Sequence, residues 1–510
     1  MSKKDGLAFD YRQKRVYPFI VFSVSTLTLF LALYCSPARA DLEARIQRIE
    51  NGLEPEPGIV LKGQMPQKAV LLDRMSAYKI PGVSIAVIND YKIEWARGYG
   101  VKEAGENDPV TVRTLFQAAS ISKPVAALAT LYFVEQGLLD LDDDVNGKLR
   151  SWRVPDNEFT SSKKVTLRGM ISHNAGLTVH GFRGYGQGEE VPSLHQVLDG
   201  EKPANSKAIR VDKEPGTGFR YSGGGYTVIQ QLLIDVKGKP FPEIMRETVL
   251  DKLKMIDSTY EQPLPESLAN QAATAHRMNG KAIQGKWHTY PEMAAAGLWT
   301  TPADLCRFAI EVMKSRKGRS QRVLSQKMIR QMLTEQAEGI GLGLFLWDEG
   351  EDFRFMHGGS NEGFRCVLMA YPEKGQGAAI MTNSDYGGSL MSELLRSLST
   401  EYGWKHFRPV EKDVAEIDPD TYEEYAGIYQ VTPSRKIKIT REGDRLFADP
   451  IFVIPSGDTQ CEIFPESETV FFMTRASQKI TFTRDEKGKV NGLFLEDGGR
   501  RMKAKKLRRE

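Results

Sequence analysis

Two pairs of apolar segments, far apart in the sequence, constrain the fold of this chain most strongly. The segment GVSIAVINDYKIEWARGYG (82–100) alternates in polarity and turns at Asn89-Asp90, which predicts a β-hairpin. The segment FRCVLMAYPEKGQGAAIMTN (364–383) predicts two more strands, and SLMSELLRSLSTEYGW (389–404) has helical periodicity. The residues between these pairs are mostly helical or loop. A sheet assembled from both ends, with helices inserted between, predicts an α/β or α+β domain of roughly 350 residues.

The C-terminal part of the chain has a different pattern. Residues 406–425 are charged and contain proline, which predicts a linker. Short alternating stretches then follow, divided by Gly, Asp and Pro turns, and they predict a small antiparallel β-barrel. The predicted boundaries are 41–405 for the first domain, 406–422 for the linker and 423–510 for the barrel. The basic end of the chain, RRMKAKKLRRE, is interpreted as a solvated tail.

The first 40 residues have the pattern of an export signal. A positively charged start precedes an uncharged run from Val16 to Cys35, and Ala38-Arg39-Ala40 offers a small-x-small cleavage site. Residues 1–40 are therefore predicted to be a cleaved signal peptide, and the mature protein to be periplasmic or extracellular. The uncharged run is also long enough to span a bilayer, so an uncleaved anchor through residues 16–38 stays open.

Charge and cysteine content exclude several classes of function. The formal charge is +3, and residues 1–40 hold six Lys and Arg against two Asp, so the remainder is close to neutral and no nucleic-acid partner is expected. Cys306, Cys366 and Cys461 form no disulfide framework and have no zinc-site spacing. The acidic run at 140–145 lacks the glycine and glutamate of an EF-hand. No metal and no cofactor are predicted.

The stretch FQAASISKPVAALATLYFVEQG (116–137) contains one lysine in an otherwise apolar segment. A buried ammonium is costly unless it is paired or neutralised, so this lysine needs a reason. The pattern Ser-x-x-Lys occurs three times in the chain, as Ser76/Lys79, Ser120/Lys123 and Ser161/Lys164. Only the pair Ser120/Lys123 opens a strongly apolar predicted helix.

Helical spacing places Ser120 and Lys123 on the same face of that helix. Burial would lower the pKa of the lysine and let it accept the serine proton, which is how a serine nucleophile is activated. The local sequence equally allows Ser120 to be an N-cap and Lys123 to extend to the surface.

Two further segments favour a hydrolytic site. The segment EPGTGFRYSGGGYTVIQQLL (214–233) places Tyr221 in a glycine-rich turn before an apolar helix. In FRFMHGGSNEGFRCVLMAY (353–371), His357-Gly358-Gly359 opens a strand that is bare of side chains. A substrate backbone can lie against such a strand.

In this order, the three segments resemble the serine β-lactamase and penicillin-binding-protein superfamily, on its class C side. The resemblance covers roughly residues 60–405 and includes LRGMISHNAGL (167–177), AAAGLWTTPADLCRF (294–308) and IMTNSDYG (380–387). It implies a β-lactamase/transpeptidase-like domain with a central antiparallel sheet and a helical insert. The C-terminal segment resembles the lipocalin-like barrel that follows some of these hydrolases.

The resemblance also implies roles for individual residues. Ser120 would be the acylated nucleophile, Lys123 and Tyr221 would share the general-base role, and the backbone amides of Ser120 and Ser360 would form the oxyanion hole. The residues expected to contact substrate are His357, Gly358, Gly359 and Gly223.

Two departures from the family pattern affect the expected substrate. The Tyr-x-Asn element reads Tyr221-Ser222-Gly223, so the amide side chain that helps to hold a β-lactam is missing. The Lys-Thr-Gly element reads His357-Gly358-Gly359, as in relatives such as D-aminopeptidases and some esterases. The charge of a histidine is expected to change near neutral pH, so His357 would be a weak, pH-dependent cation for a substrate carboxylate.

These observations predict an exported serine hydrolase that forms an acyl-enzyme with an amide, peptide or ester. One alternative is a class C-like β-lactamase or DD-carboxypeptidase, and another is a catalytically weak binding protein for cell-wall fragments. The expected partner is a small-molecule or peptide substrate, with no nucleic acid, and a membrane only if the N-terminal segment is uncleaved.

Overall fold

The computed structural model describes residues 37–55, 58–449, 459–476, 478–497 and 500–507. Most of the predicted signal peptide or anchor therefore lies outside the described residues, and the predicted cleavage site falls within helix α1 (Pro37–Glu50). Within the described ranges, no helix combines the length and apolar character needed to cross a membrane. The chain divides into two units, Met1–Arg48 and Ile49–Glu510, and the features described below lie in the second.

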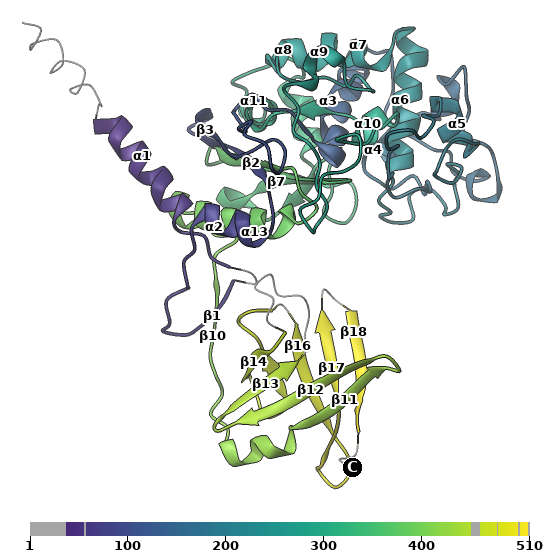
Figure 1. The fold of residues 1–510 in the computed structure, drawn as a ribbon. Helices are drawn as coiled ribbons and strands as arrows, with labels where there is room; N and C mark the ends of the chain where they lie inside the picture. The colour runs from purple at the N-terminus through teal and green to yellow at the C-terminus, as the bar shows by residue number, and fades with distance from the viewer. Residues whose placement is uncertain (1–36, 56–57, 450–458, 477, 498–499, 508–510) are drawn as a thin grey trace, which may run out of the picture. The chain divides into compact units, whose positions relative to one another are not determined.

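A six-stranded antiparallel sheet forms the centre of the first domain (Figure 1). Its strand order is β3-β2-β9-β8-β7-β6, so β2 from the start of the domain pairs with β9 from its end, as the sequence predicts. The first hairpin turns at Asp90 and Tyr91, one residue later than expected, and both residues have positive φ. The strands are β2 (Gly82–Asn89), β3 (Lys92–Gly100), β6 (Phe345–Trp347), β7 (Arg354–Asn361), β8 (Phe364–Tyr371) and β9 (Gln376–Thr382).

Helices cover both faces of this sheet, with α11 (Pro302–Arg316) and α13 (Gly387–Tyr402) on opposite sides (Figure 1). In β8, Cys366 and Leu368 pack into the core that includes α11, and alternation turns Val367 toward α13. Because both faces are buried, residues 366–371 of β8 and 377–381 of β9 are continuous apolar runs without alternation in polarity.

A helical insert lies between β3 and β6 in the sequence, as predicted. Its two most buried helices, α3 (Ser122–Glu135) and α6 (Gly223–Lys237), both pack against the short helix α10 (Met293–Ala296). The other helices of the domain are α2 (Leu71–Ala77), α4 (Leu167–Ile171), α5 (Leu194–Asp199), α7 (Phe241–Met245), α8 (Asp251–Leu253), α9 (Glu266–Ala269) and α12 (Gln326–Met332). The short strands β4 (Phe116–Gln117) and β5 (Trp299–Thr300) pair with each other.

The C-terminal segment forms a closed antiparallel barrel of eight strands, in the order β11 to β18. Before it, β10 (Val410–Lys412) pairs with β1 (Ile59–Leu61). The barrel strands are β11 (Gly427–Thr432), β12 (Arg435–Glu442), β13 (Arg445–Asp449), β14 (Cys461–Pro465), β15 (Val470–Phe472), β16 (Lys479–Arg484), β17 (Val490–Asp497) and β18 (Arg500–Lys506).

The interpretation of the basic C-terminal segment as a solvated tail is wrong. Residues 500–506 form β18, which pairs with β17 and β11 and closes the barrel. Met502 and Ala504 pack against the barrel core, whereas Arg501 and Lys503 alternate with them and are exposed. The high charge of this segment therefore reflects one solvated face of a strand.

Candidate active site

Ser120 lies in a tight 3₁₀ turn, Ala119–Ile121, and α3 begins only at Ser122. The expectation that Ser120 opens the α-helix is therefore wrong by two residues. Ala119 has φ of +49°, which is unfavourable for a residue with a side chain and must be held by its surroundings. The Ala118 N–H donates to the Leu298 carbonyl at 2.8 Å, which fixes the chain just before this turn.

The strand β7 packs directly against the turn that contains Ser120. A Cβ atom at Gly359 would lie 2.3 Å from the Ala118 carbonyl oxygen and 2.4 Å from Cys366 Sγ, so only glycine permits this approach. At Gly358 a Cβ would meet nothing closer than the Cys366 carbonyl oxygen, at 3.8 Å. Adjacent glycines in the same motif therefore have different reasons to be there.

We expect Gly359→Ala to lower the free energy of unfolding by about 2 kcal/mol or more, because two neighbouring groups must move. Gly358→Ala is expected to change it by less than about 1 kcal/mol, since the added methyl group meets open space. Urea denaturation of both variants measures the difference. Equal destabilisation by the two substitutions would contradict this account of the Gly359 contact.

Lys123 is buried in the first turn of α3, with 2 % of its surface exposed. Its Nζ lies 3.0 Å from Ser120 Oγ and donates a hydrogen bond to the Ala295 carbonyl at 2.8 Å. Burial lowers the pKa of Lys123 to about 7, so much of the amine is neutral at physiological pH. The alternative in which Lys123 extends to the surface and Ser120 caps a helix does not fit this geometry.

Tyr221 comes just before α6, and the Lys123 Nζ lies 5.1 Å from the centre of its ring. Burial raises the pKa of Tyr221 to about 12, although its interaction with Ser120 opposes the shift. The side chain is therefore a phenol at neutral pH and can donate or relay a proton. The two groups expected to share the general-base role therefore differ at neutral pH, because Tyr221 keeps its proton whereas much of Lys123 is neutral.

His173, for which no role was predicted, packs against Tyr221. The centres of the two rings are 4.3 Å apart, and His173 Nδ1 accepts a hydrogen bond from the Ser222 N–H at 3.0 Å. Burial lowers the pKa of His173 well below its usual value, so the ring is neutral. Its place in the segment LRGMISHNAGL was the only available signal.

The chain packs closely around Gly223, where the family pattern has an amide side chain. The Gly223 N–H donates to the His180 carbonyl and the Gly224 N–H to the Val179 carbonyl, each at 3.0 Å. A Cβ at Gly223 would lie 3.1 Å from the His180 carbonyl oxygen, so an asparagine there would require this loop to move. The His180 ring itself lies 4.8 Å from the Tyr221 ring.

His357 is buried in the middle of β7, not at the start of the strand, and only 2 % of its surface is exposed. Its Nδ1 lies 2.7 Å from the Gly358 carbonyl and donates to it, while Nε2 has no hydrogen-bond partner among the described residues. Burial, and secondarily the charge of Lys123, lowers the pKa of His357 to about 3. The expectation that its charge changes near neutral pH is therefore wrong, chiefly because an imidazolium at this position would be desolvated, and below about pH 7 it would also lie near the charged form of Lys123.

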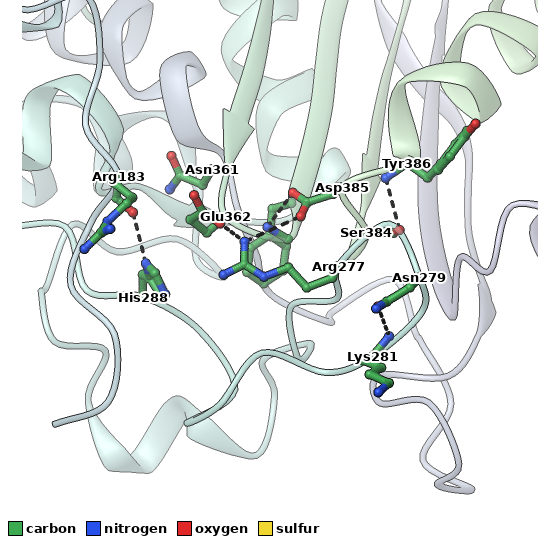
Figure 2. Close-up of polar contacts among 12 residues, drawn as sticks. Arg183, Arg277, Asn279, Lys281, His288, Asn361, Glu362, Ser384, Asp385 and Tyr386 are labelled. Carbon is green, nitrogen blue, oxygen red and sulfur yellow. Dashed lines mark hydrogen bonds and ion pairs between the residues drawn. The ribbon is translucent and has the colours of Figure 1, made fainter. Parts of the chain in front are cut away.

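The far end of β7 is held by a polar network (Figure 2). Asn361 Nδ2 donates to Gln117 Oε1 at 2.8 Å, which joins β7 to the strand that leads to Ser120. In the turn after β7, Glu362 forms an ion pair with Arg277. Arg277 Nη1 also lies 3.7 Å from Asp385 Oδ2. These contacts fix the position of β7 beside the turn that contains Ser120.

One cavity of about 940 Å³ brings most of the predicted residues together. Gly223 does not line it. The residues that do are Ser120, Lys123, Tyr221, His357, Gly358, Gly359 and Ser360. The described residues that line this cavity include no Asp, Glu or Arg, and Lys123 provides its only amine. With Lys123 largely neutral and His357 uncharged, these two groups offer little fixed charge to a substrate.

The fold and this arrangement of residues define a β-lactamase-like protein. The family model described as Beta-lactamase matches residues 68–398, so the chain belongs to the Beta-lactamase family, whose members are serine hydrolases. A second model, described as a domain of unknown function (DUF3471), matches residues 411–508.

Two curated relatives show the same likeness over most of their length. Penicillin-binding protein 4* of Bacillus subtilis (strain 168) is 21 % identical, over 80 % of this chain and 91 % of the relative. Penicillin-binding protein 4 of Amycolatopsis lactamdurans is 26 % identical, over 69 % of this chain and 94 % of the relative.

Solved structures share the fold. The octameric penicillin-binding protein homologue from Pyrococcus abyssi has a TM-score of 0.57 and 21 % identity, and the alignment covers 85 % of this chain and 98 % of that chain. SurE has a TM-score of 0.52 and 22 % identity, over 86 % of this chain and 97 % of that chain.

Proposed function

We propose that this protein is an exported serine hydrolase that acts on an amide, peptide or ester through an acyl-enzyme at Ser120. The observation that carries the proposal is the 3.0 Å separation of Ser120 Oγ from Lys123 Nζ in a cavity where the pKa of Lys123 is lowered to about 7. A serine hydroxyl at hydrogen-bond distance from a neutral amine is an activated nucleophile, because the amine can accept its proton. Export rests on the pattern of residues 1–40 alone.

The proposed reaction uses the side chains of Ser120, Lys123 and Tyr221 and the backbone N–H groups of Ser120 and Ser360. Ser120 Oγ attacks the substrate carbonyl while its proton moves to Lys123 Nζ. The backbone N–H groups of Ser120 and Ser360 donate to the resulting oxyanion. When the C–N or C–O bond breaks, the proton passes through the Tyr221 hydroxyl to the leaving group. A water molecule then attacks the acyl-enzyme. One of the water protons passes to Ser120 Oγ, the ester bond to Ser120 breaks, and the free acid leaves.

The neutral state of His357 bears on the choice of substrate. A Lys-Thr-Gly lysine offers a cation to a substrate carboxylate, whereas His357 offers an uncharged imidazole with a pKa of about 3. Gly223 adds no amide, and the loop at His180 occupies the space beside it. Both features favour a neutral amide or ester over a β-lactam or a peptide that ends in a carboxylate.

The pH dependence of activity should follow Lys123. For a neutral ester, we expect kcat/KM to rise about tenfold per pH unit below pH 7 and to level off above it, because only the neutral amine can accept the Ser120 proton. His357→Gln should leave the midpoint of this profile in place, since His357 is already neutral. Measurement of kcat/KM from pH 5 to 9 in both proteins tests this. A midpoint that disappears in His357→Gln would identify His357 as the titrating group.

A substrate panel tests the proposed class of reaction. It consists of D- and L-aminoacyl amides, short-chain esters and nitrocefin, and the structure of SurE solved with D-Leu motivates the D-aminoacyl members. We expect turnover of neutral amides or esters and little turnover of nitrocefin. A fluorophosphonate probe should label Ser120. Absence of both labelling and turnover would favour the binding-protein alternative.

A further inference from the structure

The cavity that contains Ser120 continues around the exposed edge of β7 to the other face of the sheet. The pairing of β7 with β6 ends at Met356, so β6 does not extend along the later residues of β7. Gly359 faces the turn that contains Ser120, because its Cβ position points at the Ala118 carbonyl oxygen. By alternation, Met356, Gly358 and Ser360 face the α13 side, and all three line the cavity.

One face of helix α13 forms the wall of this second half. Gly388, Met391, Ser392 and Leu395 line the cavity, and their i, i+3, i+4, i+7 spacing places them on a single stripe of the helix. Across from them lie Met356 and Val367, and Phe407 contributes a further wall. We call this half of the cavity, lined by Met356, Val367, Met391, Ser392, Leu395 and Phe407, the α13 groove. None of these side chains carries a charge.

The passage between the two halves is open because Gly358 has no side chain. The fold does not require glycine there, since its φ is not left-handed and a Cβ would meet no atom closer than 3.8 Å. Gly388, at the start of the stripe, likewise has nothing within 4 Å of its Cβ position. Both glycines therefore keep space open toward the groove where the fold would accept a larger residue. Gly359 is the contrasting case, because packing alone explains it.

Phe407, which forms part of the groove, has an unfavourable backbone conformation. Its φ of +63° is unfavourable for a bulky residue, and strain of this kind concentrates at sites that hold ligands. The ring lies 5.9 Å from the guanidinium of Arg354, at the start of β7. This contact orients an aromatic side chain beside an otherwise aliphatic groove.

We propose that the α13 groove binds a long apolar arm of the substrate, an aliphatic or aromatic chain that crosses Gly358 from the bond attacked by Ser120. The inference rests on the proposed function, because it concerns substrates of the same site. The chemistry of the groove is the reason for the class of ligand: six uncharged and mostly apolar side chains give no partner to a charged group and bury methylene groups well. The chain belongs either to the acyl group or to the leaving group.

Two series of esters test the proposal in the full-length protein. The first has acyl chains of 2 to 10 carbons on a constant p-nitrophenol, and the second has alkyl alcohols of increasing length on a constant short acyl group. In one series we expect kcat/KM to rise up to about fourfold per methylene until the groove is filled. The series that shows the rise identifies which side of the bond occupies the groove. A flat profile in both series, with turnover of the short esters, would overturn the inference and leave the proposed function intact.

Ser392→Phe is the variant that fills the groove, because Ser392 is a small residue on the stripe and is partly exposed. We expect it to reduce the ratio of kcat/KM for the longest ester to that for the shortest by about thirtyfold or more. Thr400→Phe is the matched control: Thr400 is exposed on the same helix and does not line the cavity, so the ratio should stay as in the unmodified protein.

Labelling by a small fluorophosphonate and the melting temperature show whether each variant is folded. If Ser392→Phe does not fold, Phe407→Ala gives the second measurement, and removal of that ring should lower the same ratio about fivefold or more. An unchanged ratio in a folded Ser392→Phe or Phe407→Ala variant would overturn the inference. If the unmodified protein showed neither labelling nor turnover of any ester, that result would instead contradict the proposed function.

Discussion

Ser120→Ala should lower turnover of the best substrate by more than about 10⁴-fold and abolish labelling by a fluorophosphonate, because no other group can form the acyl-enzyme. The protein should remain folded, since Ser120 is only partly buried and the turn around it is held by Ala118 and Gly359. Steady-state kinetics, intact-protein mass spectrometry after labelling and a melting curve measure the three expectations.

The other two Ser-x-x-Lys motifs provide matched controls for this substitution. Ser76 and Ser161 are exposed and lie outside the cavity. Ser76→Ala and Ser161→Ala should therefore keep activity within about twofold of the unmodified protein. If Ser120→Ala kept even a tenth of the activity, its assignment as the nucleophile would be wrong.

Lys123→Met should lower kcat by about 10³-fold, within the range typical for loss of a general base. Methionine is similar in length and apolar, so it fills the buried site without an amine. The rate of labelling at Ser120 should fall in parallel, because the same deprotonation precedes attack on the probe. Activity within tenfold of the unmodified protein would mean that another group accepts the Ser120 proton.

The same variant has a signature in stability. The pKa of Lys123 falls from 10.5 to about 7 on folding, so between these values the unfolded chain binds the proton and the folded protein does not. Stability of the unmodified protein therefore gains from this group as the pH rises from about 7 toward 10.5, and Lys123→Met lacks that gain. The melting temperature of Lys123→Met, relative to that of the unmodified protein, should decrease between pH 7 and 9.5. A difference that does not depend on pH would contradict the lowered pKa.

Several features of this protein could be predicted because they depend on the pattern of polar and apolar residues within short segments. The segment 82–100 alternates in polarity around a turn, the segment 364–383 has two short apolar runs around a turn, and the pairing of β2 with β9 confirms that they belong to one sheet. The barrel was predicted from alternation within each short strand. Ser120 and Lys123 were selected because an apolar helix start is an unusual place for a lysine.

Other features depend on contacts between residues far apart in the sequence. Residues 500–506 are basic in isolation and become a barrel strand only when β11 and β17 pair with them. The hydrogen bond from Lys123 to Ala295 and the burial that lowers its pKa come from a helix about 170 residues further on. His357 was expected to titrate near neutral pH because its isolated side chain does so. Its pKa of about 3 results from packing that no local pattern reveals.

Sequence alone therefore determined the class of fold, the order of its parts and the serine and lysine of the candidate site, since periodicity and a misplaced polar residue are local properties. Tertiary structure alone decided the protonation states, the reason for each glycine and the groove beside α13. Gly358 and Gly359 illustrate the difference: they are identical neighbours in the sequence, yet one is required by a carbonyl 2.3 Å from its Cβ position and the other faces open space. Electrostatic and steric environments are set by neighbours in space, and the chain must fold before those neighbours exist.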